Sequence, residues 1–524
     1  MAWWRRAALV SGVALSLGVG VVYRPYLRAE ALVEPKIEGI GQPDRQVEMV
    51  NWSGNHSVQA NLFYTPSSEG EVQSIMAHHQ AYRIPIRPSG TGLSPNGLSF
   101  EPSAMITLSQ MTQLAHVDVE KKLVRVQPGI SIENLSKQLA PHGLTLQNFA
   151  SIREQQLVGF TQAGAHGTGV RIPPVDEQVE SFTLISPAKG RLEVSREGTP
   201  ELFKLMNVGL GCFGVITEMT IKCVEDHYLR EETLVKTWDQ IKADHRKDLL
   251  AFRHLRYLWI PYTRETIVVK SNPVGKGCQE RSTVNHPQSN AMRTLLKEHS
   301  PSLDDVDTLG IAQMRDHLLA INCTDPKWIR QVNRAELEAW RQFDGTVEID
   351  RSDQILGFDC GGQQLVFEVC FNIGDPAAEG HPMPEIQFIE ELMELIESSD
   401  IPAPSPIEQR FSARSSSLMS PAYSDDESDA FCWVGIIIYL PDELQRKDAL
   451  AIFDAYRNLL MDHLGDRYEL KVHWAKVELP KDTLRASSWR QRIQRQFPLT
   501  QFHTLRKEHD PDHLLINELL TSLL

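Results

Sequence analysis

Helical and strand patterns alternate along the first half of the chain. Val72, Ile75 and Met76 recur at helical spacing behind two serines that can cap a helix, so the pattern predicts a helix there. Prolines then favour an extended conformation over 83–87, and the apolar run 123–126 predicts a strand. This order of elements is typical of a mixed α and β domain.

The same alternation continues to the middle of the chain. A helix with one apolar face begins at Ile132 and is ended by a proline and a glycine. A helix over 201–206, a glycine-rich turn over 209–214 and a strand over 215–223 form a further unit. These units predict an α+β or α/β sandwich over residues 51–225.

A second domain is predicted after residue 225, where longer apolar strands such as 432–440 appear. A chain of 524 residues is long enough for more than one domain. Residues 274–307 are polar and weakly periodic, which predicts a long insertion. The stretch 489–524 has a helical pattern interrupted by prolines, and it could pack on either domain.

Residues 1–30 are predicted to be a targeting segment or a membrane anchor. The 17 residues from Ala7 to Tyr23 carry no charge, and arginines flank them with no acid before Glu30. Such a run is at the lower limit of a membrane-spanning length. A mitochondrial presequence with an anchoring segment and a secretory signal peptide both fit this pattern.

The charge and the cysteines limit the classes of partner. The net charge is -15, although the first 29 residues are positive, so the remaining chain is strongly acidic and should repel nucleic acid. Seven cysteines are scattered without close pairs, which fits neither a disulfide framework nor a Cys-x-x-Cys metal site. We therefore expect mostly reduced, buried thiols, no metal and no nucleic-acid partner.

Three glycine-rich segments are candidate ligand loops. The first is RPSGTGLSPNG over 87–97, the second is GFTQAGAHGTG over 159–169, and the third is the turn 209–214. Small residues let backbone N–H groups approach an anion closely, and several such loops suit an extended ligand such as a dinucleotide. Three tight turns in a strand-rich domain remain the alternative.

An acid and two arginines alternate in the segment that follows the proline-rich stretch 402–406. If 407–414 is a strand, then Glu408, Arg410, Ser412 and Arg414 share one face. That face could hold a hydroxylated substrate, with arginine stabilising developing oxyanion charge. It could equally be an exposed strand face with ordinary ion pairs.

Two further positions have chemistry-bearing side chains. The segment His473-Trp-Ala-Lys476 could bring an imidazole and a lysine into a site, although a histidine beside tryptophan is more often structural. Cys360 has glycine neighbours that permit access, yet a free cysteine is usually a buried apolar residue. Neither position defines a function from the residues alone.

Together these stretches resemble the aldonolactone oxidoreductases of the vanillyl-alcohol-oxidase flavoprotein superfamily. The resemblance covers about residues 50–524 and is carried by collinear motifs: NWSG, RPSGTGLSPNG, LTLQNFASIREQQ, GAHGTG, PPVDEQV, LGFDCGGQQ, PIEQR and HWAK. It implies a two-domain α+β fold with an FAD-binding domain of two subdomains over 51–225 and a cap domain over 226–485. Residues 486–524 would return to the FAD-binding domain.

The resemblance also implies the residues of the site. Glu408, Arg410 and Lys476 match the family's catalytic positions. The residues that look like FAD-binding positions are Ser89, Gly90, Thr91, Gly92, Leu93, Ser94, Ala150, Ser151, Gly164, His166, Gly167, Thr168 and Val215. Many members of the superfamily have a flavin-linked histidine where this chain has Leu93, so the FAD is expected to be non-covalent.

The activity that the resemblance implies is the oxidation of an aldono-1,4-lactone, L-galactono-1,4-lactone being expected, to L-ascorbate. Cytochrome c would accept the electrons, at the intermembrane-space side of the mitochondrial inner membrane. An association with assembly intermediates of respiratory complex I is also implied, and a scaffold role is one alternative. An oxygen-using aldonolactone or alditol oxidase is the other.

Overall fold

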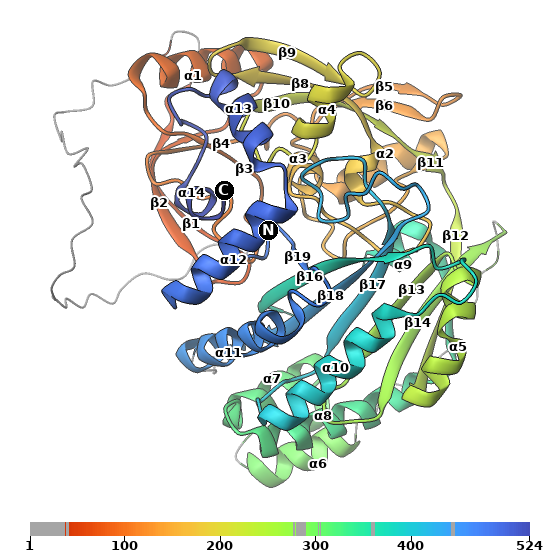
Figure 1. The fold of residues 1–524 in the computed structure, drawn as a ribbon. Helices are drawn as coiled ribbons and strands as arrows, with labels where there is room; N and C mark the ends of the chain where they lie inside the picture. The colour runs from red at the N-terminus through yellow and green to blue at the C-terminus, as the bar shows by residue number, and fades with distance from the viewer. Residues whose placement is uncertain are drawn as a thin grey trace, which may run out of the picture. The chain divides into compact units, whose positions relative to one another are not determined.

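The computed structural model describes residues 37, 41–275, 278, 290–301, 303, 305–357, 362–441 and 446–524. The first sheet has the strand order β1-β2-β4-β3, with β2, β4 and β3 parallel (Figure 1). Its strands are β1 (Asp44–Val50), β2 (Ser57–Tyr64), β3 (Arg87–Ser89) and β4 (Ala104–Thr107). Helix α1 (Glu69–Tyr82) makes the crossover from β2 to β3, and the hydroxyl of Ser68 caps it.

The second sheet is antiparallel and has the order β5-β6-β10-β8-β9. Its strands are β5 (Leu114–Asp118), β6 (Leu123–Val126), β8 (Val179–Ser186), β9 (Gly190–Ser195) and β10 (Val215–Lys222). Helices α2 (Ile132–Leu139), α3 (Leu157–Gln162) and α4 (Pro200–Met206) lie in its connections, and β7 (Leu144–Thr145) pairs with β11 (Val224–Glu225). Apolar residues of this sheet and its helices belong to one buried core.

The third sheet is antiparallel and larger, with the order β15-β12-β14-β13-β17-β18-β16-β19. Its strands are β12 (Tyr228–Thr237), β13 (His254–Trp259), β14 (Glu265–Val274), β15 (Thr346–Arg351), β16 (Gln364–Gly374), β17 (Ile407–Ala413), β18 (Ala430–Tyr439) and β19 (Lys471–Val472). Since successive side chains point to opposite faces, each central strand presents two different surfaces.

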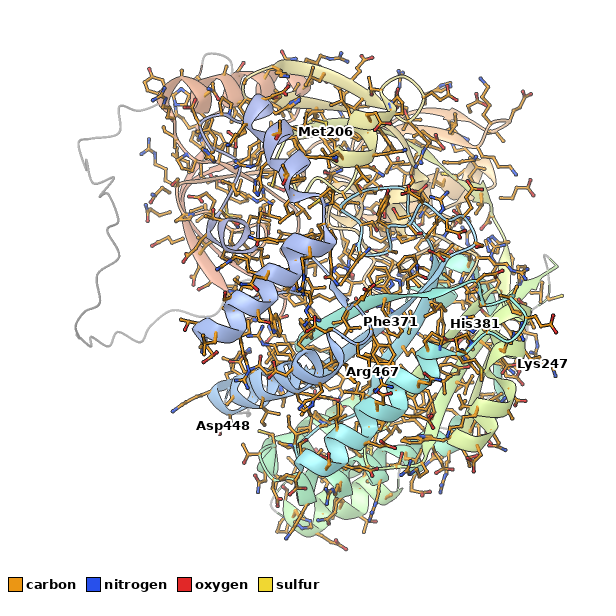
Figure 2. The ribbon with its side chains drawn as sticks, viewed as in Figure 1. Met206, Lys247, Phe371, His381, Asp448 and Arg467 are labelled. Carbon is orange, nitrogen blue, oxygen red and sulfur yellow. The ribbon has the colours of Figure 1, made fainter. Side chains whose placement is uncertain are left out.

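One face of this sheet is apolar and covered by helices. The helices are α5 (Trp238–Ala251), α10 (Pro384–Ser399), α11 (Arg446–Leu464) and α12 (Thr483–Gln496). Phe371 of β16, labelled in Figure 2, packs on Phe388 of α10 with ring centroids 4.9 Å apart. The burial of this face fixes the register, so the alternate residues of β16, β17 and β18 must point the other way.

The other face is covered at one end by three helices. They are α6 (Asn290–His299), α7 (Ile311–Asn322) and α8 (Pro326–Trp340), and they share a core with Ile437 and Tyr439 of β18. A short helix, α9 (Ser352–Leu356), follows β15. The middle of this face is left to the polar residues described below.

The C-terminal helices α13 (Leu499–His509) and α14 (Glu518–Leu523) lie against the first two sheets. The amide of Asn517 donates to the carbonyl oxygens of Gly97 at 2.9 Å and Leu98 at 3.1 Å. The hydroxyl of Ser186 in β8 donates to the carbonyl oxygen of His509 at 3.0 Å. The last residues of the chain therefore contact the segment that follows β3.

The helices predicted from the sequence for 51–225 are confirmed, and so are the strands around 123–126, 215–223 and 432–440. The extended segment predicted over 83–87 begins later than expected, because Arg83 has a φ of 53° and β3 runs from Arg87 to Ser89. Part of the long insertion predicted over 274–307 is helical. Helix α6 occupies 290–299, and its Met292 and Leu296 are fully buried, so two apolar residues a turn apart are enough when neighbouring helices cover them.

Several predictions concern parts of the chain with few or no described residues. The targeting or anchor segment 1–30 and Cys360 lie outside the described residues. The six cysteines that are described are all free, and four of them are buried. Within the described ranges, no helix has the length and apolar character needed to cross a membrane.

Candidate active site

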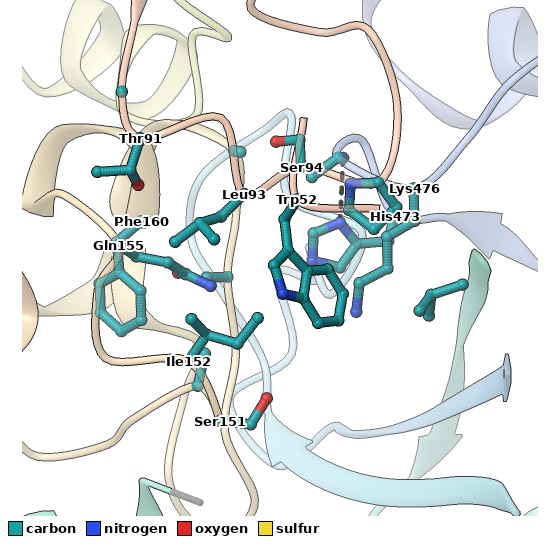
Figure 3. A pocket seen from close by; sticks show the side chains of 18 of the residues that line it. Trp52, Thr91, Leu93, Ser94, Ser151, Ile152, Gln155, Phe160, His473 and Lys476 are labelled. Atoms are coloured by element: carbon teal, nitrogen blue, oxygen red, sulfur yellow. Dashed lines mark hydrogen bonds between the residues drawn. The ribbon is translucent and has the colours of Figure 1, made fainter. Parts of the chain in front are cut away.

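A cavity of about 690 Å³ lies between the glycine-rich loops and the polar face of the third sheet. On the loop side it is lined by residues of the segments 87–99, 150–166 and 210–216. On the sheet side it is lined by residues of β13, β16, β17 and β18 and of helices α7 and α8. Figure 3 shows Trp52 between the loop side chains Leu93 and Ile152 and the pair His473 and Lys476.

The loop that follows β3 forms one wall of the cavity. All six residues from Ser89 to Ser94 line it, and Gly92 has a φ of 71°, a conformation that glycine adopts without strain. The side-chain amide of Asn51 donates to the carbonyl oxygen of Ser94 at 3.0 Å. The backbone N–H of Trp52 donates to the carbonyl oxygen of Gly92 at 2.8 Å. The NWSG segment thus fixes the shape of this loop.

The same loop is tied to the HWAK segment. The amide of Asn96 donates to the carbonyl oxygens of Trp474 at 2.9 Å and Val477 at 2.8 Å. The Trp474 side chain is fully buried, and its indole N–H donates to the carbonyl oxygen of Met419 at 2.6 Å. These bonds hold Lys476 at the edge of the loop.

Ala150 and Ser151 lie on the second wall and also line the cavity. The hydroxyl of Thr91 donates to the carbonyl oxygen of Glu154 at 3.3 Å, which joins the two walls. Gly167 lies against the residues that precede Ala150: a Cβ placed there would be 2.0 Å from Oδ1 of Asn148 and 2.5 Å from the carbonyl oxygen of Phe149. Only glycine therefore allows Asn148 and Phe149 to approach so closely.

The remaining expected FAD positions divide into two groups. His166 and Val215 line the cavity, whereas Gly164, Gly167 and Thr168 lie outside its lining. The hydroxyl of Thr168 donates to the carbonyl oxygen of Leu255, and its own carbonyl oxygen contacts the His254 ring at 2.7 Å. These outer residues hold the segment against β13.

The loop side is suited to a large ligand with an anionic part. Oε1 of Gln156 is buried without a hydrogen-bond partner among the described residues, and a Cβ on Gly90 would be 3.4 Å from it. The fully buried guanidinium of Arg87 donates to the carbonyl oxygens of Leu98, Leu210, Gly211 and Leu515, with no carboxylate among these partners. An unused acceptor, close backbone approach and a buried cation held by carbonyl oxygens fit a dinucleotide cofactor such as FAD.

Glu408 and Arg410 lie on the sheet side, on neighbouring same-face positions of β17. Nε of Arg410 is 3.4 Å from Oε2 of Glu408, and Nη2 donates to Oε1 of Glu368 at 2.9 Å. Ser412 accepts a hydrogen bond from the Trp433 indole instead. The expectation that Arg414 belongs to the same strand face is wrong, because β17 ends at Ala413 and Arg414 pairs with the exposed Glu427.

Lys476 reaches the same carboxylate from the other direction. Its Nζ is 2.5 Å from Oε2 of Glu368, and His166 Nε2 is 3.0 Å from the same oxygen. The His166 ring also stacks on Trp433, with centroids 3.8 Å apart. Glu368 therefore accepts from three side chains that come from three separate segments.

The charges of this cluster determine its protonation. Burial lowers the pKa of His166 to about 4, and Arg410 and Lys476 add to that effect, although Glu368 opposes it. Burial, with the charge of Lys476, also holds the pKa of His473 well below its usual value. Both rings are thus neutral at pH 7, and a neutral His166 donates from Nε2, because the carboxylate is a better acceptor than the Gly167 carbonyl oxygen at Nδ1.

Burial alone would raise the pKa of Glu368, but Lys476, His166 and Arg410 outweigh it and hold that pKa well below the usual value. Glu368 and the two histidines bring ligand atoms within 4.8 Å of one another, which is close enough for a metal ion. Both oxygens of Glu368, however, are already bound by cations. A divalent ion there would face two positive charges, so the arrangement is an ion-pair network.

The far end of the cavity lies under helices α7 and α8. Arg315 covers the ring of Tyr439, with its guanidinium carbon 3.2 Å from the centroid, and Glu336 bonds the hydroxyl of Ser405 at 2.5 Å. Burial raises the pKa of Glu336. Sequence reasoning missed these lining residues, because no local sequence pattern shows that a helix covers strands that are distant in the chain.

Sequence reasoning also missed Glu368, although a local signal was present. It is the one acid in the apolar run from Leu365 to Phe371, where an unpaired charge would be costly. A charged residue inside such a strand indicates a buried partner. The partners themselves lie 42 and 108 residues further along the chain.

Comparisons with known proteins agree with this description. The family model "FAD binding domain" matches residues 60–195, and "D-arabinono-1,4-lactone oxidase" matches residues 219–523. The chain is similar to cholesterol oxidase from Brevibacterium sterolicum, with a TM-score of 0.69 at 15% identity over 92% of this chain and 97% of that one. At this identity the similarity shows the fold.

Two relatives by sequence are more informative. The mitochondrial L-galactono-1,4-lactone dehydrogenase of Arabidopsis thaliana is 44% identical over 493 residues, which is 90% of this chain and 80% of the relative. The L-gulonolactone oxidase of Bos taurus is 26% identical, over 90% of this chain and 97% of the relative. The chain matches both almost from end to end.

The fold and the site thus define an FAD-dependent oxidoreductase with an α+β fold of the vanillyl-alcohol-oxidase type, in which an FAD-binding domain is followed by a second domain. FAD is its cofactor. Within that class the chain belongs to the aldonolactone oxidoreductase family, together with the L-galactono-1,4-lactone dehydrogenases.

Proposed function

We propose that this protein oxidises L-galactono-1,4-lactone to L-ascorbate and passes the electrons to cytochrome c. The names of its most informative relatives support the substrate. The observation that carries the proposal is the pair Glu408 and Arg410, side by side on the cavity face of β17 and opposite the glycine-rich loops. An acid and a guanidinium at that place suit a neutral, hydroxyl-bearing ring.

The FAD is proposed to lie along the loop side. Ser89 to Ser94 would hold its diphosphate through backbone N–H groups, and Ala150, Ser151, His166 and Val215 would contact the rest. Gly164, Gly167 and Thr168 would act by holding those residues in place. Leu93 has no nucleophilic nitrogen, so we propose that the FAD is bound without a covalent link.

Bound FAD would supply the acceptor for a hydride leaving the substrate carbon. The oxidation also removes the proton of the substrate hydroxyl, which would pass to water, and Arg410 and Lys476 would stabilise the negative charge that builds up on that oxygen as the proton leaves, since both are cations at the cavity wall. Glu408 would accept hydrogen bonds from substrate hydroxyls and so orient the ring. The neutral rings of His166 and His473 add no competing charge.

We propose domain ranges that match the division of the chain into its sheets. Residues 51–225 would form the FAD-binding domain and 226–485 the cap domain. Residues 486–524 would return to the FAD-binding domain, which the bonds from Asn517 to Gly97 and Leu98 support. Helix α12 at the start of that segment packs on the cap sheet instead, through Trp489 and Phe367 at 5.3 Å.

The acceptor and the location are proposed on other grounds. The net charge of -15 suits a basic partner such as cytochrome c. The relatives are named mitochondrial, and we propose the intermembrane-space side of the inner membrane, reached through residues 1–30. An additional association with assembly intermediates of respiratory complex I belongs to the same proposal.

The test is the reduction of the purified yellow protein by the lactone without oxygen, followed in a stopped-flow instrument. Bleaching of the flavin by the lactone is expected, and reoxidation should be fast with cytochrome c and slow with oxygen. Fast reoxidation by oxygen would indicate an oxidase. A flavin that no aldonolactone reduces would leave only a scaffold role.

A further inference from the structure

Glu368 is the most buried charged group next to the cavity, yet it does not line it. Its side chain is 1% exposed. It lies behind four residues that do line the cavity: Arg410, Lys476, His166 and His473. A carboxylate in such a place costs several kcal/mol unless it is paired and hydrogen-bonded. Its partners therefore explain why it is tolerated.

Without Glu368, its two cationic partners would repel each other. Arg410 comes from β17 and Lys476 from the loop after β19, and each binds a different oxygen of Glu368, at 2.9 and 2.5 Å. Because both side chains bind the same carboxylate, their positive charges lie close together, and they repel each other strongly in a medium of low dielectric constant. The carboxylate between them removes that repulsion.

The backbone leaves room for this arrangement. Gly435 of β18 lies between Glu408 on one side and Glu368 on the other. A Cβ at Gly435 would be 3.6 Å from Oε1 of Glu368, so any longer side chain would enter the space in which Glu368 meets Arg410. The sheet thus brings the acid and the guanidinium together across an intervening strand.

Several charged and titratable groups among the described residues surround the two cations: Glu368 from β16, Glu408 from β17, Arg256 from β13, His166 from the segment before β8, and His473 from the loop of Lys476. The two histidines are neutral. Glu368 contacts both cations.

We propose that Glu368 is a positioning residue, which holds Arg410 and Lys476 together as one doubly cationic site while that site stabilises the substrate oxyanion. The proposal rests on the function proposed above. It predicts that the charge of Glu368, rather than its size, is what the reaction needs.

The variant Glu368→Gln tests this charge. Glutamine has the same size, but one oxygen becomes an NH₂ group, a donor that would face other donors. In a crystal structure of the FAD-bound variant, we expect Arg410 or Lys476 to lie out of hydrogen-bond distance of residue 368. Flavin reduction by the lactone should be about 100-fold slower at pH 8.

The limiting rate of flavin reduction, measured per bound FAD, distinguishes positioning from a merely structural role. Displaced cations no longer act on the charge that develops during the reaction, so this rate should fall, with little change in the lactone concentration that gives half of it. The control is Glu385→Gln. Glu385 is an equally buried carboxylate that pairs with His245 at 2.8 Å, on the face away from the cavity. That variant should lose thermal stability and keep the wild-type limiting rate.

Three outcomes would overturn the proposal. They are an unchanged limiting rate, a change confined to the lactone concentration that gives half of that rate, and a variant structure in which both cations stay in place. If Glu368→Gln does not retain FAD, Glu368→Asp replaces it, because aspartate keeps the charge and should stay close to the wild-type rate. A loss of about 100-fold in Glu368→Asp would also overturn the proposal. Failure of the lactone to reduce the wild type would refute the proposed function instead, while crystal structures of the wild type and of Glu368→Gln still test the role of Glu368.

Discussion

Glu368 and Arg410 join their side chains across strand β18, with 2.9 Å between Oε1 and Nη2. The two residues belong to strands that do not pair with each other, and Gly435 lies on the strand between them. Arg410 also contacts Glu408 at 3.4 Å, so its guanidinium is held from two sides. Its orientation toward the cavity is fixed before a substrate arrives.

The pair Glu408 and Arg410 should be needed for reduction of the flavin but not for its binding. Both side chains lie on the sheet side of the cavity, away from the glycine-rich loops. We expect Glu408→Ala and Arg410→Ala to bind FAD as the wild type does. Each should slow flavin reduction by the lactone roughly 100-fold or more, because a contact to developing negative charge is lost. Near wild-type rates in single-turnover measurements would remove the pair from the mechanism.

The FAD should be released by denaturation. Leu93 lines the cavity and has no nucleophilic nitrogen that could form a link to the flavin. His166, the other candidate, is held by Glu368 through Nε2 and is stacked on Trp433, so its ring is not free to form a bond. Acid precipitation should leave yellow FAD in solution. A fluorescent pellet would show that another residue makes a covalent link.

The strand periodicity of 407–413 was sufficient to predict that Glu408 and Arg410 share a face, because a period of two follows from backbone geometry alone. The position of Arg414 was not predictable, because it depends on where β17 ends. The packing of the C-terminal segment was left open by its sequence, since Asn517 and Gly97 are 420 residues apart. The partners of Glu368 were not predicted for the same reason, because they lie on distant segments and no local sequence pattern identifies them.

Asp176 should make stability depend on pH. Its carboxylate is buried and accepts from Ser415 at 2.5 Å, and burial, with the neighbouring Glu177, raises its pKa to about 6. Between pH 4 and 6 the folded protein binds a proton that the unfolded chain does not. The raised pKa therefore costs stability as pH rises through this range, by up to roughly 3 kcal/mol above pH 6.

The measurement is the melting temperature of Asp176→Asn compared with the wild type from pH 4 to 7. The wild type should lose stability relative to the variant as pH rises, and the difference should level off above pH 6. Asp425→Asn, at an exposed carboxylate of the 424–429 loop, is the control for the loss of one charge. A difference between Asp176→Asn and the wild type that does not change with pH would contradict the prediction.

Ala150 is expected to limit the reaction of the reduced flavin with oxygen. It is half-buried, lines the cavity and packs against the main core, so its methyl group occupies a fixed place on the cavity wall. The two residues before it, Asn148 and Phe149, are packed tightly against Gly167, which fixes the backbone that carries this methyl group. A fixed methyl beside a reactive carbon blocks a small diffusing molecule, whereas electron transfer to a protein acceptor needs no such access.

The variant Ala150→Gly should therefore be reoxidised by oxygen at least about tenfold faster, with little change in its reduction by the lactone. Ala163→Gly removes a methyl from another position on the same wall and serves as the control, with oxygen reactivity expected to stay low. Stopped-flow mixing of the lactone-reduced proteins with aerated buffer measures both. Slow reoxidation of Ala150→Gly with FAD fully bound would mean that the barrier to oxygen lies at another residue of the cavity, and Leu93 on the opposite wall would be the next position to shorten.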